Sequence, residues 1–240
     1  AAIRLLREQG AILQEKRGGR ATDFGRFGIF ADFDSNTGGI VELKCESAPV
    51  TSNEEFVQLA NDLARQLATG PGAETADELL DQASPSKEGM TLREQKDDLF
   101  NRIREVFNVG RMKKLAGTCG GYSHNSGTVS GVLLSVEGGN SAAAKDVCMH
   151  IAAMRPACMD IEDLNAEEVA KERSVLRDAA LNEGKPENIV DKMVEGRMRN
   201  YYAEQVLKEQ PFVKGDKISV GKFAEESDMK LNEFVHWELG

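Results

Sequence analysis

Residues 40–68 read IVELKCESAPVTSNEEFVQLANDLARQLA and contain two periodic patterns joined by a loop. Residues 41–46 alternate between apolar and charged side chains, which is typical of a half-buried β-strand. Residues 56–67 repeat apolar side chains at helical spacing and predict an amphipathic helix over 54–68. The loop between them carries Ala48, Pro49 and Val50 where a turn is usually polar. We therefore expect a strand, an unusually apolar loop and a helix.

A second stretch repeats this order of elements. Residues 132–136 predict a strand, residues 138–140 a turn, and residues 144–152 a helix. Ala144 follows Phe56 by 88 residues, and Ala152 follows Ala64 by the same number. This constant shift indicates two related halves. The longer loop of the first half is then the candidate functional tip.

The composition limits the classes of function. Of 240 residues, 40% are hydrophobic and 29% charged, and the formal net charge is −10. Broad binding to nucleic acid or anionic membranes needs a basic field, which this charge does not supply. No apolar run approaches the roughly 20 residues of a membrane-spanning helix. The four cysteines fall mostly within apolar patterns, as reduced thiols do. We expect a soluble, cytoplasmic protein.

Further elements complete the two halves. Residues 27–33 and 40–45 predict a β-hairpin, residues 92–107 a helix, and residues 111–118 a closing strand. Residues 71–98 carry eight acidic and three basic side chains and predict a loosely packed helical insertion. Residues 120–127 predict a turn that opens the second half. A short helix near 220–226 and a strand over 233–239 follow.

Residues 165–209 predict a helical hairpin of the coiled-coil kind. They hold ten acidic and eight basic side chains, and the chain reverses at residues 184–186. The fold class is therefore α+β, with two related half-domains of antiparallel strands packed on helices and a projecting antiparallel helical hairpin. The first half-domain spans residues 27–119. The second is formed by residues 120–164 together with residues 210–240.

Five short motifs resemble the elongation factor Ts family. They are Gly-Lys-Pro at 184–186, Lys-Met-Val-Glu-Gly-Arg at 192–197, Gln-Pro-Phe-Val at 210–213, Val-Glu-Leu-Lys-Cys-Glu at 41–46 and Met-His-Ile-Ala-Ala at 149–153. The resemblance runs, with gaps, from about residue 3 to residue 240. It implies a guanine-nucleotide exchange factor for the translational GTPase elongation factor Tu.

Two features depart from the family pattern. Residues 1–26 match only the last helix of the family's N-terminal helical domain and its linker, so we expect a remnant of that domain. The family's exchange loop usually reads Thr-Asp-Phe-Val, and the matching residues here are Ser47, Ala48, Pro49 and Val50. In the family, the aspartate and phenylalanine are thought to disturb the magnesium site of the GTPase. Ala48 lacks the carboxylate and Pro49 lacks the ring.

The resemblance implies that residues 47–50, together with Met149 and His150, contact the partner. Packing offers a simpler interpretation of each site. Residues 47–50 can form a plain turn stiffened by Pro49, and His150 can be a histidine satisfied within the packing of its helix. Because the two halves differ in this loop, we favour partner contact for residues 47–50. For His150 both interpretations stay open.

Cysteine and histidine chemistry is a competing class of function. The residues concerned are Cys119, His124, Cys148, His150 and Cys158. They lack the short spacings of zinc ligands. Positions two apart on a helix point in different directions, so Cys148 and His150 do not make a nucleophile and base. The sequence also lacks the glycine-rich phosphate-binding motifs. We expect no enzyme activity, no metal site and no cofactor.

Two functions remain. The first is a translation elongation factor that binds elongation factor Tu, with GDP or without nucleotide, and promotes GDP release. The alternative is a non-exchanging protein that binds and stabilises the same GTPase, which the missing Asp-Phe pair favours. We expect no direct contact with nucleic acid or membrane, and the hairpin is a candidate dimer contact.

Overall fold

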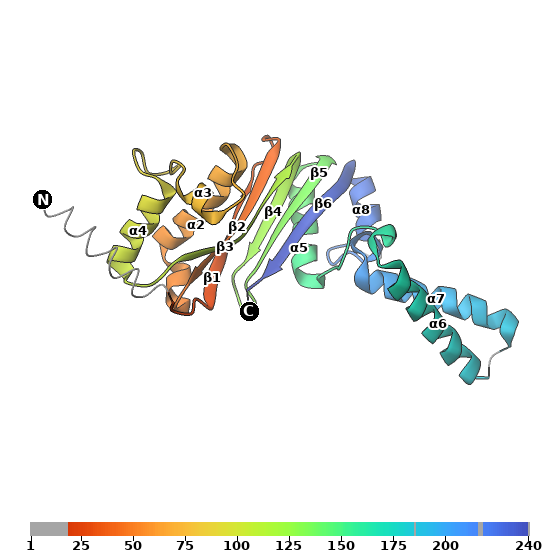
Figure 1. The fold of residues 1–240 in the computed structure, drawn as a ribbon. Coiled ribbons are helices and arrows are strands. Elements are labelled where there is room, and N and C mark those ends of the chain that lie inside the picture. Colours follow the sequence, from red (N-terminus) through yellow and green to blue (C-terminus); the bar gives the residue numbers. More distant parts are fainter. Residues whose placement is uncertain (1–18, 185, 216–217, 240) are drawn as a thin grey trace, which may run out of the picture.

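The computed structural model describes residues 19–184, 186–215 and 218–239 (Figure 1). Over these residues the chain forms two three-stranded antiparallel sheets with helices packed on them. The α+β class predicted from the sequence is therefore confirmed. The helix expected near residues 3–9 lies outside the described residues.

The first sheet contains β1 (Phe24–Ala31), β2 (Thr37–Cys45) and β3 (Asn108–Ala116), in the order β1-β2-β3. Helix α2 (Glu54–Thr69) packs against this sheet. The helix begins after Asn53, whose side-chain oxygen accepts hydrogen bonds from the backbone N–H groups of Glu55 and Phe56. Both elements predicted from residues 40–68 are thus present.

The second sheet contains β4 (Thr118–His124), β5 (Ser130–Gly138) and β6 (Met229–Glu238), in the order β4-β5-β6. Helices α5 (Ser141–Met154) and α8 (Val220–Glu226) pack against it. The prediction of a turn at residues 120–127 is wrong, because residues 120–124 belong to β4. Gly121 lies inside this strand, and no larger residue fits there because a Cβ would lie 2.6 Å from Ile29 Cγ2. The glycine permits close packing of two strands rather than a turn.

The two sheets pack face to face, with the helices on the outer sides (Figure 1). Alternate residues of β5 show the arrangement: Val132 and Leu134 face α5, while Leu133 packs between the sheets. Strand β2 is consequently covered on both faces, and Glu42 is only 4% exposed. The expectation of a half-buried strand was wrong for this reason.

The acidic insertion is well packed, contrary to the expectation from its charge. It contains α3 (Ala76–Leu80) and the start of α4 (Leu92–Ile103), and Leu79 and Leu92 are fully buried. Its acidic side chains lie mostly on the exposed side. Helix α4 ends at Ile103 rather than at residue 107 because Arg104 adopts the left-handed conformation, with φ of 65°.

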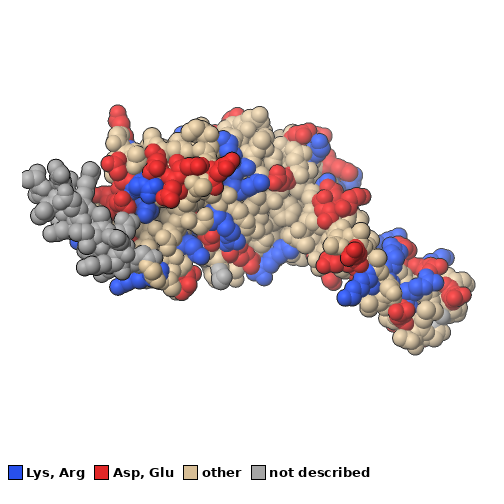
Figure 2. All heavy atoms as spheres, viewed as in Figure 1, with Lys and Arg blue, Asp and Glu red and all other residues tan. Residues whose placement is uncertain are grey.

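The helical hairpin projects from the second half (Figure 1). It consists of α6 (Ala166–Asn182) and α7 (Glu187–Gln205), flanked by the short 3-10 helices η2 (Ile161–Asp163) and η3 (Leu207–Glu209). Ala180, Val190 and Met198 are fully buried between its helices. Acidic and basic side chains intermingle on its surface (Figure 2). No helix among the described residues is both long enough and apolar enough to span a membrane.

Candidate partner-binding site

The loop after β2 is a short 3-10 turn, η1 (Ala48–Ser52), with Pro49 near its start. Ala48 and Pro49 are exposed, whereas Val50 is 9% exposed and belongs to the core of the first half. The apolar tip predicted from the sequence therefore consists of two residues, and the third anchors it. Ser47 is partly buried at the start of the turn.

Hydrogen bonds to two other segments, residues 105–106 and strand β1, hold this turn in place. The Ser47 backbone N–H donates to Glu105 Oε2 at 3.1 Å, and its hydroxyl donates to the other carboxylate oxygen. Glu46 Oε1 accepts from the Val106 backbone N–H at 2.8 Å. Arg26 Nη1 donates to the Thr51 carbonyl oxygen at 2.8 Å. The tip is therefore stiff, as the proline suggested, but most of the supporting contacts come from distant residues that the sequence pattern did not reveal.

Met149 and His150 lie on α5, in the other half of the molecule. The His150 ring is fully buried and Met149 is partly buried. His150 Nε2 lies 2.8 Å from Gln210 Oε1, and Nδ1 accepts a hydrogen bond from the Val213 backbone N–H at 3.3 Å. This pairing places the proton on Nε2, and burial lowers the pKa of the ring.

In this conformation His150 joins α5 to residues 210–213. The structure thus shows the packing role that we considered for this histidine. A direct contact between its side chain and a partner would first require exposure of the ring.

The thiols are poorly suited to nucleophilic chemistry. Burial raises the pKa of Cys45 to about 12 and that of Cys119 to about 11, and it also raises the pKa of Cys148. These groups therefore stay protonated near neutral pH. Among the described residues, no group of three or more histidine, cysteine or acidic side chains is placed to hold a metal ion.

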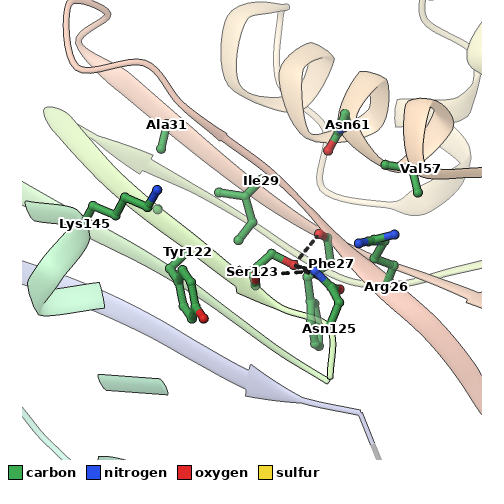
Figure 3. Close-up of a pocket in the computed structure, with 11 residues that line it drawn as sticks. Arg26, Phe27, Ile29, Ala31, Val57, Asn61, Tyr122, Ser123, Asn125 and Lys145 are labelled. Carbon is green, nitrogen blue, oxygen red and sulfur yellow. Dashed lines mark hydrogen bonds between the residues drawn. The ribbon is translucent and has the colours of Figure 1, made fainter. Parts of the chain in front are cut away.

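An open groove of about 450 Å³ lies where the two halves meet (Figure 3). Strands β1 and β4 contribute most of its lining, with Asn61 from α2 and Lys145 from α5. Arg26 connects this groove to the apolar tip, because it lines the groove and also bonds to Thr51. Sequence reasoning missed the groove since its residues come from four separate elements.

Comparison with known proteins decides the family. The family model described as elongation factor TS matches residues 49–240. Elongation factor Ts of Methylococcus capsulatus is 37% identical over 243 residues, covering all of this chain and 81% of that protein. The chain belongs to the elongation factor Ts family.

Other relatives agree with this assignment. Elongation factor Ts of Thioalkalivibrio sulfidiphilus is 36% identical over 244 residues, covering all of this chain and 81% of the relative. That of Clostridium botulinum strain Eklund 17B is 37% identical over 253 residues, again over the whole chain and 82% of the relative. As a member of the elongation factor Ts family, the protein is a translation elongation factor.

Proposed function

We propose that this member of the elongation factor Ts family binds elongation factor Tu, with GDP or without nucleotide, and promotes release of GDP. The observation that carries the proposal is the exposed pair Ala48 and Pro49, held on a rigid turn at the position of the family's exchange loop. The protein would act in the cytoplasm without a catalytic or nucleotide site of its own.

Exchange of this kind requires preferential binding to the nucleotide-free GTPase. By thermodynamic linkage, a factor that binds this form more tightly weakens GDP binding by the same ratio. The rigid tip favours such binding because it loses little conformational entropy on docking. Ala48 and Pro49 supply a small apolar surface, so the proposed wedge acts by its bulk rather than through a carboxylate near the magnesium ion.

The second candidate function is binding without exchange. It is favoured by the same two residues, because neither supplies the carboxylate or aromatic ring that the family resemblance associates with exchange. A protein of this kind would bind both nucleotide states of elongation factor Tu equally, and the nucleotide affinity would then be unchanged.

Stopped-flow release of fluorescent GDP from elongation factor Tu separates the two functions. We expect release to accelerate with concentration of the chain and to reach a plateau. Acceleration should be absent with an unrelated acidic protein of similar size. Binding without acceleration would support the second function, and absence of binding would overturn both.

The hairpin is a further proposed contact, in this case with a second copy of the chain. Val175, Leu181 and Ile189 are each more than 40% exposed on its helices. Sedimentation equilibrium over a range of concentrations would test this, and a monomer at every concentration would contradict it.

A further inference from the structure

The groove between the halves has a floor suited to a polypeptide segment. Phe27, Ile29 and Ala31 are alternate residues of β1, and all three line it. The opposite side comes from β4, including Gly121 and Ser123. Both strands are at the edge of their sheets, as the strand order shows. The groove thus follows two neighbouring edge strands. Ile29 and Ala31 are partly exposed on its floor and Phe27 is buried beneath it, so an extended segment can lie along a mixed polar and apolar surface.

The charge of the groove is opposite to that of the whole protein. Its lining contains two basic residues, Arg26 and Lys145, and no acidic residue, although the formal net charge of the chain is −10. Figure 3 shows these two residues at opposite ends of the groove. Asn61 and Asn125 add neutral amide groups between them. The groove is therefore complementary to a segment that carries negative charge.

We propose that this groove binds an acidic segment of elongation factor Tu and extends the interface beyond the apolar tip. The inference rests on the proposed function. Continuity supports it, because Arg26 lines the groove and holds the turn that carries Ala48 and Pro49. The proteins would meet through the tip and the groove together.

An RNA strand is a weaker candidate for the same groove. Nucleic-acid binding draws most of its affinity from many phosphate contacts. Two basic residues on a protein of net charge −10 supply few of them. A protein segment with one or two carboxylates fits this number of charges better.

Charge substitutions in the groove test the inference. Lys145→Glu and Asn61→Asp each add negative charge at exposed positions of two different helices. Lys171→Glu on α6 is the matched control, because Lys171 is also an exposed helical lysine and lies outside the groove lining. Thermal unfolding of the three variants establishes that each is folded.

The measurement is the Kd for nucleotide-free elongation factor Tu at low and high salt. We expect Lys145→Glu to raise the Kd at least about tenfold at low salt, Asn61→Asp to raise it less, and both effects to shrink at high salt. Lys171→Glu should stay within about twofold of the wild type.

If wild-type binding is tight and both groove variants match the control, the inference fails while the proposed function stands. If the wild type does not bind, both fail. Binding of a short RNA that Lys145→Glu abolishes, with binding to the GTPase unaffected, would overturn the inference in favour of RNA.

Discussion

Nε2 of His150 lies 2.8 Å from Oε1 of Gln210 inside the second half of the molecule. The amide of Gln210 in turn donates to the carbonyl oxygen of Glu204 at 3.1 Å. Glu204 belongs to the last turn of α7, so two side chains connect α5 to the base of the projecting hairpin. This chain of hydrogen bonds makes His150 a residue that positions the hairpin.

We expect His150→Ala to lower the free energy of unfolding by about 2–4 kcal/mol. The substitution leaves Oε1 of Gln210 and the Val213 backbone N–H without their partner and opens a cavity. A partner-facing His150 would predict slower exchange with little loss of stability, whereas the buried ring predicts a loss of stability. Urea unfolding measures the change. His124→Ala, at an exposed histidine, is the control and should cost less than about 0.5 kcal/mol. Equal effects would contradict the positioning role.

Stability should fall as the solution is acidified below about pH 6.5. Burial lowers the folded-state pKa of both His150 and His236. As pH falls through the unfolded value of about 6.5, the unfolded chain binds protons that the folded chain does not, so unfolding becomes more favourable. The loss continues until the pH reaches the lower folded-state pKa values. Urea unfolding at pH 7.5, 6.5 and 5.5 tests this, and a His150→Asn variant should show a shallower decline. A flat profile in the wild type would contradict the prediction.

Replacement by alanine should have opposite effects on stability at a glycine between the sheets, Gly38, and at a glycine in the hairpin, Gly196. A Cβ at Gly38 would lie 2.7 Å from both Cβ and Sγ of Cys119, so Gly38→Ala should destabilise the fold by about 1–3 kcal/mol. A Cβ at Gly196 in α7 meets no atom within 4 Å. Gly196→Ala should therefore stabilise the protein by about 0.5–1 kcal/mol through helix propensity. Thermal or urea unfolding of this pair checks both signs, and destabilisation by both would contradict the open space around Gly196.

Periodicity predicted much of the fold. The apolar stripe over 56–67 and the charge-balanced stretch 165–209 each correspond to helices in the structure, α2 in one case and the α6–α7 hairpin in the other. Local patterns failed where tertiary contacts decide the outcome. Gly121 was assigned to a turn because the strand it packs against was unknown. Glu42 was assigned to an exposed face, yet the second sheet covers it.

Arg111 shows why the burial of Glu42 was not predictable. Its guanidinium donates to both carboxylate oxygens of Glu42, at 2.9 and 3.0 Å, and also to the Glu238 carbonyl oxygen. Burial alone would raise the pKa of Glu42, but the bonds to Arg111 and its charge bring that pKa below its ordinary value. The three residues belong to three strands, and no sequence spacing brings them together. The candidate site follows the same rule: the turn at residues 47–50 was predicted, whereas Glu105, Arg26 and the groove depend on the fold.

The turn itself allows a test of the proposed exchange mechanism by restoring the family residues. Ala48→Asp with Pro49→Phe should leave GDP release equal or faster. Both side chains are exposed, and the contacts that hold the turn come mainly from Ser47, Val50 and Thr51. The added ring supplies the kind of aromatic anchor that often dominates binding at the centre of an interface.

Pro49→Gly should slow GDP release by only about two- to fivefold. The substitution adds up to about 1 kcal/mol of loop entropy, while Glu105 and Arg26 still fasten the turn. Glu105→Ala should slow release more, because it removes both hydrogen bonds to Ser47. Stopped-flow release of fluorescent GDP compares the variants, and thermal unfolding identifies any that are misfolded. If a folded Pro49→Gly variant lost all exchange while Glu105→Ala retained it, the rigidity of the tip would reside in the proline rather than in the hydrogen bonds around it.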